Sequence, residues 1–289
     1  MMSDGIGSRR EFLKASSAAA AGAMLVSGNA RQAKAKNISV APLLMTASAS
    51  FDGGDLKGRF VYDGTPPARK PVVITADKDF CCKQNILEEN LVVDPASRGV
   101  ANVIIWLYLA KGDEPPAIHS SYAETEKADV HLDCNGCRFE PHAQVLRTTQ
   151  TLLIRNLNPI GDSAKIDTLS NPPINIVIPI KGQWRQSYAS AERMPARVSC
   201  SLHPWESGWL LVKEHPYMAV SKIDGSFAIK NLPPGKWAFQ FWHEQSGYLT
   251  EVKSQGKATV WKRGRAEFDI KPGENDLGEL VLAPGLFAT

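Results

Sequence analysis

Short apolar runs separated by turn residues make up the chain beyond residue 50. Four of these runs have the length and composition of β-strands: Leu56–Tyr62, Val100–Leu109, Thr151–Arg155 and Asn175–Ile180. Nineteen prolines and 22 glycines interrupt the chain at intervals typical of a sandwich. The helical candidates, such as Ser121–Lys127, are short. The pattern predicts an all-β protein, and it lacks the glycine-rich phosphate loop of nucleotide-binding α/β folds.

A second group of strands is predicted after His215. Trp237, Phe239 and Phe241 alternate along one of these strands, directly after the turn Pro233–Gly235, so their rings share one face. Rings in this arrangement more often form a core than a binding platform. Further strands are expected at Ala258–Trp261, Ala266–Ile270 and Leu277–Leu282.

The first 35 residues have the pattern of an export signal. Ser8–Lys14 contains the twin-arginine sequence, the apolar run Ala15–Val26 follows, and small residues offer cleavage after Ala30 or Ala35. The run is shorter than the roughly 20 residues that a membrane-spanning helix needs, and no later stretch is long enough. We therefore expect a protein without a membrane span that is exported to the periplasm by the twin-arginine route.

The charge of the chain lies mainly in this signal. Its five basic and two acidic residues account for the whole formal net charge of +3, so the remainder is formally neutral. The lysines and arginines of the remainder are scattered and form no basic cluster. This distribution argues against nucleic acid or an anionic membrane surface as a partner.

The five cysteines form two close pairs and one single residue. Disulfides are permitted after export, and the pairs bridge most simply as Cys81–Cys137 and Cys82–Cys134. The crossed arrangement and a local Cys134–Cys137 bridge remain open alternatives. A four-cysteine zinc site is a weaker alternative, because adjacent cysteines are poorly spaced as ligands of one ion. Cys200 is left over, as either a metal ligand or a buried, inert thiol.

Cys200 stands three residues before His203, between two apolar runs in the stretch Val198–Val212. This spacing places both residues on a tight loop between two predicted strands. Such a loop can turn a thiolate and an imidazole nitrogen toward one point. The pair is therefore half of a small metal site with soft-ligand character.

Four motifs follow one another along the chain: Asp133–His142, Thr151–Gly161, Cys200–Trp205, and His215–Val220 with Asp224–Phe227. Together they resemble the exported cupredoxin-like proteins of the plastocyanin-like or methylamine-utilisation type, which carry a trailing carboxypeptidase-regulatory-like, transthyretin-like β domain. The resemblance implies a Greek-key cupredoxin-like sandwich followed by a smaller transthyretin-like sandwich. It also implies copper binding and electron transfer, with a periplasmic redox protein as partner. It leaves the oligomeric state open.

The resulting division is a signal at 1–35, a linker at 36–50, a cupredoxin-like domain at 51–214 and a carboxypeptidase-regulatory-like domain at 215–289. Residues 52–110 can complete the first sandwich or pack with the tail. We expect the former, because the bridges from Cys81 and Cys82 would tie this segment to the Cys134–Cys137 loop.

The resemblance also implies a metal ligand set, which this chain alters. Cys200 and His203 match the thiolate and the C-terminal imidazole, but Glu206 replaces the weak axial methionine and Asp162 stands where the first histidine is expected. Carboxylates are harder donors than imidazole or thioether, so they favour the higher oxidation state of copper and make zinc more competitive. We expect a metal among these four residues without a blue-copper spectrum.

His142 is a further candidate ligand, because the pair Pro141–His142 belongs to the same pattern and can supply the missing imidazole. Its alternative role, which we favour, is that of a hydrogen-bonded structural histidine. Neither the identity of the metal, copper or zinc, nor its presence follows from the residues alone.

Three functions are compatible with these residues. The favoured one is a metal-binding protein with an altered ligand set, acting in electron transfer or metal handling. The second is a metal-free binding or scaffold module on the same fold. The third is an enzyme with Cys200 as nucleophile and His203 as base. No third orienting group or oxyanion loop is recognisable, so we do not expect an enzyme.

Overall fold

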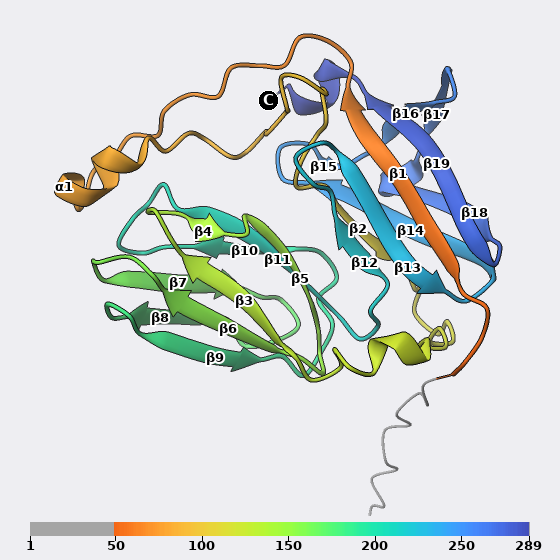
Figure 1. The fold of residues 1–289 in the computed structure, drawn as a ribbon, viewed down its shortest axis with the longest axis horizontal. Coiled ribbons are helices and arrows are strands. Elements are labelled where there is room, and N and C mark those ends of the chain that lie inside the picture. The colour runs from red at the N-terminus through yellow and green to blue at the C-terminus, as the bar shows by residue number, and fades with distance from the viewer. Residues whose placement is uncertain (1–48, 289) are drawn as a thin grey trace, which may run out of the picture. The chain divides into compact units, whose positions relative to one another are not determined.

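The computed structural model describes residues 49–288. The predicted signal at 1–35, and the predicted linker apart from its last two residues, lie outside this part of the chain. Across residues 49–288 the regular structure is nineteen β-strands in four sheets, one short α-helix and four 3₁₀ turns. This composition confirms the all-β prediction (Figure 1). No helix in the described part is long and apolar enough to cross a membrane.

The site sandwich consists of two sheets, in the orders β5-β11-β10-β7-β8 and β4-β3-β6-β9. Its core takes residues from both sheets, among them Leu132 and Ile154 from one and Val198 and Leu210 from the other. The strands are β3 (Asp129–Cys134), β4 (Phe139–Glu140), β5 (Ala143–Arg147), β6 (Thr151–Asn156), β7 (Asp162–Asp167), β8 (Ile174–Ile178), β9 (Gln183–Ser187), β10 (Ala196–Ser199) and β11 (Ser207–Lys213).

The C-terminal sandwich contains the sheet β13-β1-β19-β16-β17 and the sheet β12-β2-β14-β15, in which β18 also pairs with β14. Phe239 and Phe241 lie in its core, as their alternation predicts, together with Leu56 and Phe60 of the first strand. The strands are β1 (Gly54–Tyr62), β2 (Ile104–Leu107), β12 (Met218–Val220), β13 (Ser226–Leu232), β14 (Gly235–His243), β15 (Gly247–Tyr248), β16 (Glu251–Ser254), β17 (Lys257–Val260), β18 (Arg265–Ile270) and β19 (Gly273–Leu282).

The helical elements are small. The α-helix is α1 (Lys78–Cys81), and the 3₁₀ turns are η1 (Cys82–Gln84), η2 (Ser120–Tyr122), η3 (Lys262–Gly264) and η4 (Pro284–Phe287). The helical candidate at 121–127 therefore consists of the end of η2, one bend and four turn residues.

Strands β1 and β2 correct the expected assignment of residues 52–110 to the first sandwich. β1 pairs in parallel with β19 and antiparallel with β13, and β2 lies between β12 and β14. The physical reason is that Leu56 and Phe60 are fully buried among residues of the C-terminal sandwich. The sheet pairing therefore does not follow the expected boundary between 214 and 215.

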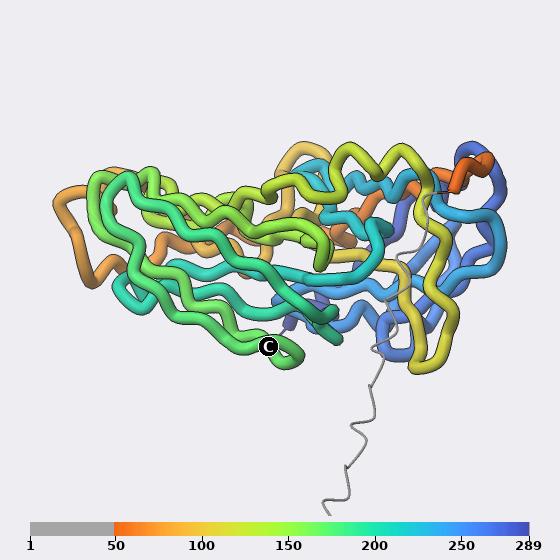
Figure 2. Tube along the Cα trace, turned by 90° about the horizontal axis from the view of Figure 1, so that it is seen from below, coloured from red at the N-terminus to blue at the C-terminus, as the bar shows by residue number. Residues whose placement is uncertain are grey.

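One segment between β1 and β2 does reach the site sandwich. We name residues 70–90 the strap; it carries α1 and η1. Its two ends pair, because Val72 N donates to Ile86 O at 3.1 Å and Glu88 N donates to Lys70 O at 2.8 Å. Figures 1 and 2 show the orange strap beside the green strands of the site sandwich, whereas β1 lies with the blue strands.

A disulfide fastens the strap to the loop between β3 and β4. It joins Cys81 to Cys137, which confirms one of the two expected bridges. The second bridge is wrong, because Cys82 is an exposed free thiol and Cys134 is a free thiol buried in the core of the site sandwich. Successive side chains of a helical turn point about 100° apart, so Cys81 and Cys82 cannot both face the same loop.

Candidate metal centre

Three adjacent strands of one sheet bring four predicted site residues together. β10 lies between β7 and β11 and runs antiparallel to both, so the end of β10 meets the starts of its neighbours. Asp162 is the first residue of β7, Cys200 follows β10 directly, and Glu206 directly precedes β11. His203 stands in the tight turn between Cys200 and Glu206, as the spacing predicts.

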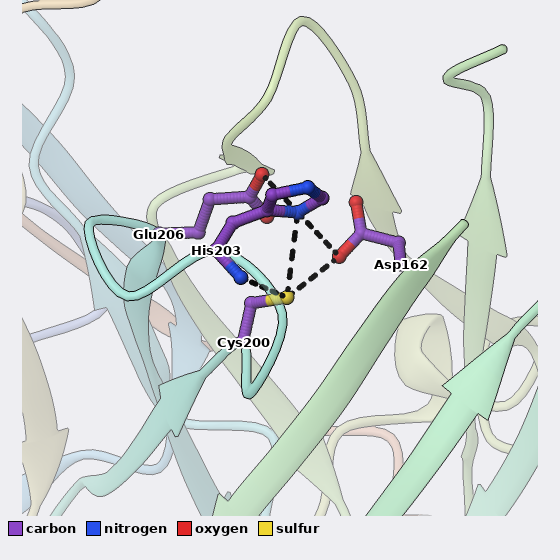
Figure 3. A group of neighbouring side chains, drawn as sticks. All are labelled: Asp162, Cys200, His203 and Glu206. Atoms are coloured by element: carbon purple, nitrogen blue, oxygen red, sulfur yellow. Dashed lines mark hydrogen bonds and ion pairs between the residues drawn. The ribbon is translucent and has the colours of Figure 1, made fainter. Parts of the chain in front are cut away.

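The four side chains converge on one point, as Figure 3 shows. One ligand atom from each of Asp162, Cys200, His203 and Glu206 lies within 4.8 Å of all the others. Cys200 Sγ donates to Asp162 Oδ1 at 3.0 Å, and His203 Nδ1 lies 3.1 Å from Glu206 Oε1. The same nitrogen is 3.6 Å from both Cys200 Sγ and Asp162 Oδ1. We call these four residues the metal group.

The metal group is buried, and one of its members is incompletely satisfied. Cys200 retains 4% of its exposed surface, and the other three retain 1% or less. Neither carboxylate oxygen of Glu206 has a hydrogen-bond partner among the described residues, although Oε1 faces His203. Burying a carboxylate without such partners is costly. A cation at the centre of the metal group would remove that cost.

Burial and mutual contacts shift the pKa values of the group in opposite directions. Burial raises the pKa of Glu206 to about 7, and the ion pair with His203 only partly offsets this. Burial lowers the pKa of His203, but its contacts with Asp162, Cys200, Glu206 and Asp77 outweigh it and raise the pKa overall. Burial also raises the pKa of Asp162, and the contacts with His203 and Cys200 lower it by more. Without a metal, His203 is therefore the cation that neutralises the buried carboxylates.

Polar neighbours hold these side chains in place. Asn158 donates from Nδ2 to Asp162 Oδ2 at 3.2 Å, and the backbone N–H of His203 donates to Cys200 Sγ at 3.3 Å. Ser163 Oγ lies 3.3 Å from the same sulfur. On its outer edge, His203 Nε2 donates to Asp77 Oδ2 at 2.9 Å. Sequence reasoning missed Asp77 and Ser163, and neither belongs to a recognisable ligand motif.

The donor set fits a divalent ion of borderline softness. One thiolate, one imidazole and two carboxylates are ligands that zinc accepts in four-coordinate sites, and Cu(II) accepts the same atoms. The thiolate of Cys200 and the carboxylates of Asp162 and Glu206 also carry the negative charge that a buried dication requires. The set does not fit a type 1 copper site, because that site needs two imidazoles around the metal and the metal group has one.

His142 lies outside the metal group. Its Nε2 is hydrogen-bonded to Glu244, and its Nδ1 lies 3.6 Å from Glu89 Oε2. Trp209 Nε1 donates to the other oxygen of Glu244 at 2.8 Å. Both ring nitrogens thus face carboxylates, and Nε2 is hydrogen-bonded to one of them, an arrangement that fits the structural role. The alternative in which His142 supplies the missing imidazole is not the arrangement that the structure shows.

We expect this histidine to make the stability of the protein depend on pH. Burial lowers the pKa of His142, but Glu244 and Glu89 outweigh it and raise the pKa from 6.5 to about 9. The ion pair therefore stabilises the fold fully below pH 6.5, and this contribution, about 3 kcal/mol, is lost as the pH rises through 9. Urea unfolding at pH 6, 8 and 10 measures it. His142→Gln should be most destabilising at pH 6 and nearly neutral at pH 10; an equal cost at all three pH values would contradict the assignment.

Comparisons with known proteins give only partial overlaps with solved structures. No protein-family model and no curated protein matches the chain. Among solved structures, a point mutant of amicyanin in its Cu(I) form has 11% identity over 29% of this chain and 82% of its own, with a TM-score of 0.27. The copper-containing nitrite reductase of Thermus scotoductus SA-01 has 14% identity over 37% of this chain and 25% of its own, with a TM-score of 0.28. A purple cupredoxin from Nitrosopumilus maritimus has 13% identity over 29% of this chain and 100% of its own, with a TM-score of 0.25.

These overlaps cover less than two fifths of this chain at low TM-scores, and they say nothing about what the chain binds. Its own fold and side chains define the class more directly. The protein is an all-β sandwich protein with a buried group of four potential metal ligands at one end of three adjacent interior strands, β7, β10 and β11.

Proposed function

We propose that this protein is a cupredoxin-type protein that holds one divalent transition-metal ion, copper or zinc, in the metal group. The observation that carries the proposal is the convergence of four buried ligand atoms within 4.8 Å, one of them on a carboxylate without hydrogen bonds. Its role is metal handling or electron transfer, and not catalysis. A bound copper ion would supply one-electron redox chemistry, and a zinc ion would supply a fixed charge.

The residues of the metal group have separate tasks in this proposal. Cys200 and His203 Nδ1 each give up a proton when the ion enters, because a thiolate and a neutral imidazole are the binding forms. Asp162 and Glu206 supply the remaining charge. Glu206 with a pKa of about 7 is largely protonated below neutral pH, so protons compete with the ion most strongly in acid.

The same proposal includes export of the protein, a redox partner, and a transthyretin-like nature of the C-terminal sandwich. They are supported by the twin-arginine pattern at Ser8–Lys14 and by the order of the motifs along the chain. Cell fractionation and N-terminal sequencing of the mature protein test the export. Recovery of the full-length chain in the cytoplasm alone would contradict it.

Metal titration tests the central claim. Protein purified without added metal is titrated with Zn(II) and with Cu(II), with bound metal measured by mass spectrometry and the visible spectrum recorded. We expect one ion per chain, and with Cu(II) a spectrum without the intense blue band of a type 1 site, because the second imidazole is missing. An intense blue band would overturn the altered ligand set. The absence of any tightly bound ion would favour the alternative, a metal-free binding or scaffold module.

A further inference from the structure

We propose that Asp77, a residue of the strap, is a positioning residue for the metal group. This inference rests on the proposed function. It starts from the two nitrogens of His203, which face in different directions. Nδ1 faces the metal group, 3.1 Å from Glu206 Oε1, whereas Nε2 donates to Asp77 Oδ2 at 2.9 Å. Asp77 is 126 residues away from His203 in the sequence.

The contact with Asp77 selects the nitrogen that a metal would meet. A carboxylate that accepts from Nε2–H holds the proton there, so Nδ1 is left as the nitrogen for the ion when the ring is neutral. The same hydrogen bond fixes the ring orientation and increases the basicity of the ligating nitrogen. Because His203 is fully buried, water does not compete with protein groups for hydrogen bonds to its ring nitrogens.

The strap is built to keep Asp77 at this point. Asp77 has left-handed backbone angles, φ 44° and ψ 41°, and its carbonyl accepts from the N–H groups of Phe80 and Cys81. Few residues other than glycine adopt this conformation without strain, and aspartate and asparagine are among them. Four residues later, the disulfide Cys81–Cys137 anchors the strap.

Trp205 packs beside His203 and also bonds to the residue that anchors the strap. Its ring lies 5.2 Å from the ring of His203, and its Nε1 donates at 3.1 Å to the carbonyl of Cys137, the residue that carries the disulfide. Beside Trp205 and Glu206, the strap borders a cavity of about 530 Å³. The strap thus covers the outer edge of His203 through Asp77, and Glu206 is the one member of the metal group that lines the cavity.

The test replaces Asp77 with asparagine. Asparagine tolerates the same backbone angles, so Asp77→Asn removes the charge without a backbone penalty. The matched control is Asp79→Asn, the same change two residues later at an exposed position of α1. Dissociation constants for Zn(II) are measured by competition with a chromophoric chelator. We expect a loss of affinity of about 10- to 100-fold for Asp77→Asn, as for other carboxylates behind a ligating histidine, and less than about twofold for the control.

A second measurement does not depend on the variants. Nitrogen-15 NMR of the wild-type imidazoles, with and without Zn(II), identifies which nitrogen of His203 carries a proton. We expect Nε2 to carry a proton that exchanges slowly with water, both with and without Zn(II). In the zinc-bound protein, the ion should be on Nδ1.

The outcomes separate this inference from the proposed function. A wild-type protein that binds no ion sinks the proposed function. A wild-type protein that binds while Asp77→Asn binds equally well leaves the metal site standing and overturns the role of Asp77. Equal losses for Asp77→Asn and Asp79→Asn would show that only the charge of the strap matters, which also overturns it. Zinc on Nε2 in the NMR experiment would do the same.

Discussion

Cys200→Ser should weaken Zn(II) binding by roughly a hundred- to a thousandfold. Structural zinc sites with four ligands bind with about 10–16 kcal/mol, so one thiolate accounts for about a quarter of this, and each 1.4 kcal/mol is tenfold. A serine hydroxyl keeps the size of the side chain but stays protonated at neutral pH and is a harder donor. Asp162, His203 and Glu206 remain in place, so the loss reports on the thiolate. Chelator competition measures the constant.

Cys82→Ser is the matched control for this substitution. Cys82 is also a free thiol, but it is exposed on the strap and lies outside the metal group. We expect its zinc affinity to equal that of the wild type. The reverse pattern, with binding lost in Cys82→Ser and kept in Cys200→Ser, would place the ion on the surface thiol and contradict the metal group. Far-UV circular dichroism checks that both variants are folded.

The local part of the candidate site could be predicted from the sequence. Cys200, His203 and Glu206 are close in sequence, so a tight turn between two strands suffices to bring them together. Asp162 follows the motif Thr151–Gly161 directly, and the resemblance predicts a ligand at this position. The structure brings a carboxylate oxygen of Asp162 within 4.8 Å of the ligand atoms of the other three residues. Whether these residues bind an ion remains a prediction.

The long-range part could not be predicted. Asp77 contacts His203 across 126 residues, and no periodicity or motif marks the strap as a neighbour of the turn. The pairing of β1 with β19 has the same character, because it joins the first and the last strands of the described chain in parallel. The apolar pattern of Leu56–Tyr62 predicts that this segment is a strand, but many strands can satisfy that pattern, and it selects none of them.

The strap's disulfide should contribute about 4 kcal/mol to the free energy of unfolding. Cys81 and Cys137 are separated by 56 residues, and closing a loop of that length restricts the unfolded chain by about this amount. The double variant Cys81→Ser/Cys137→Ser should therefore unfold at a lower denaturant concentration, with a melting temperature lower by about 10 °C for a chain of this size. Trp205 fluorescence offers a local probe, because its indole bonds to the Cys137 carbonyl.

The adjacent Cys82 again supplies the control, because Cys82→Ser removes an exposed thiol and no crosslink. This variant should unfold at the same denaturant concentration as the wild type under non-reducing conditions. Adding a reductant should lower the stability of the wild type and of Cys82→Ser together, and leave the double variant unchanged. If the reductant destabilised the double variant as well, a second crosslink would have to exist, and the assignment of Cys82 and Cys134 as free thiols would be wrong. If the double variant matched the wild type without reductant, the strap would be fastened by its apolar contacts around Ile86 and Trp205 and not by the covalent bond.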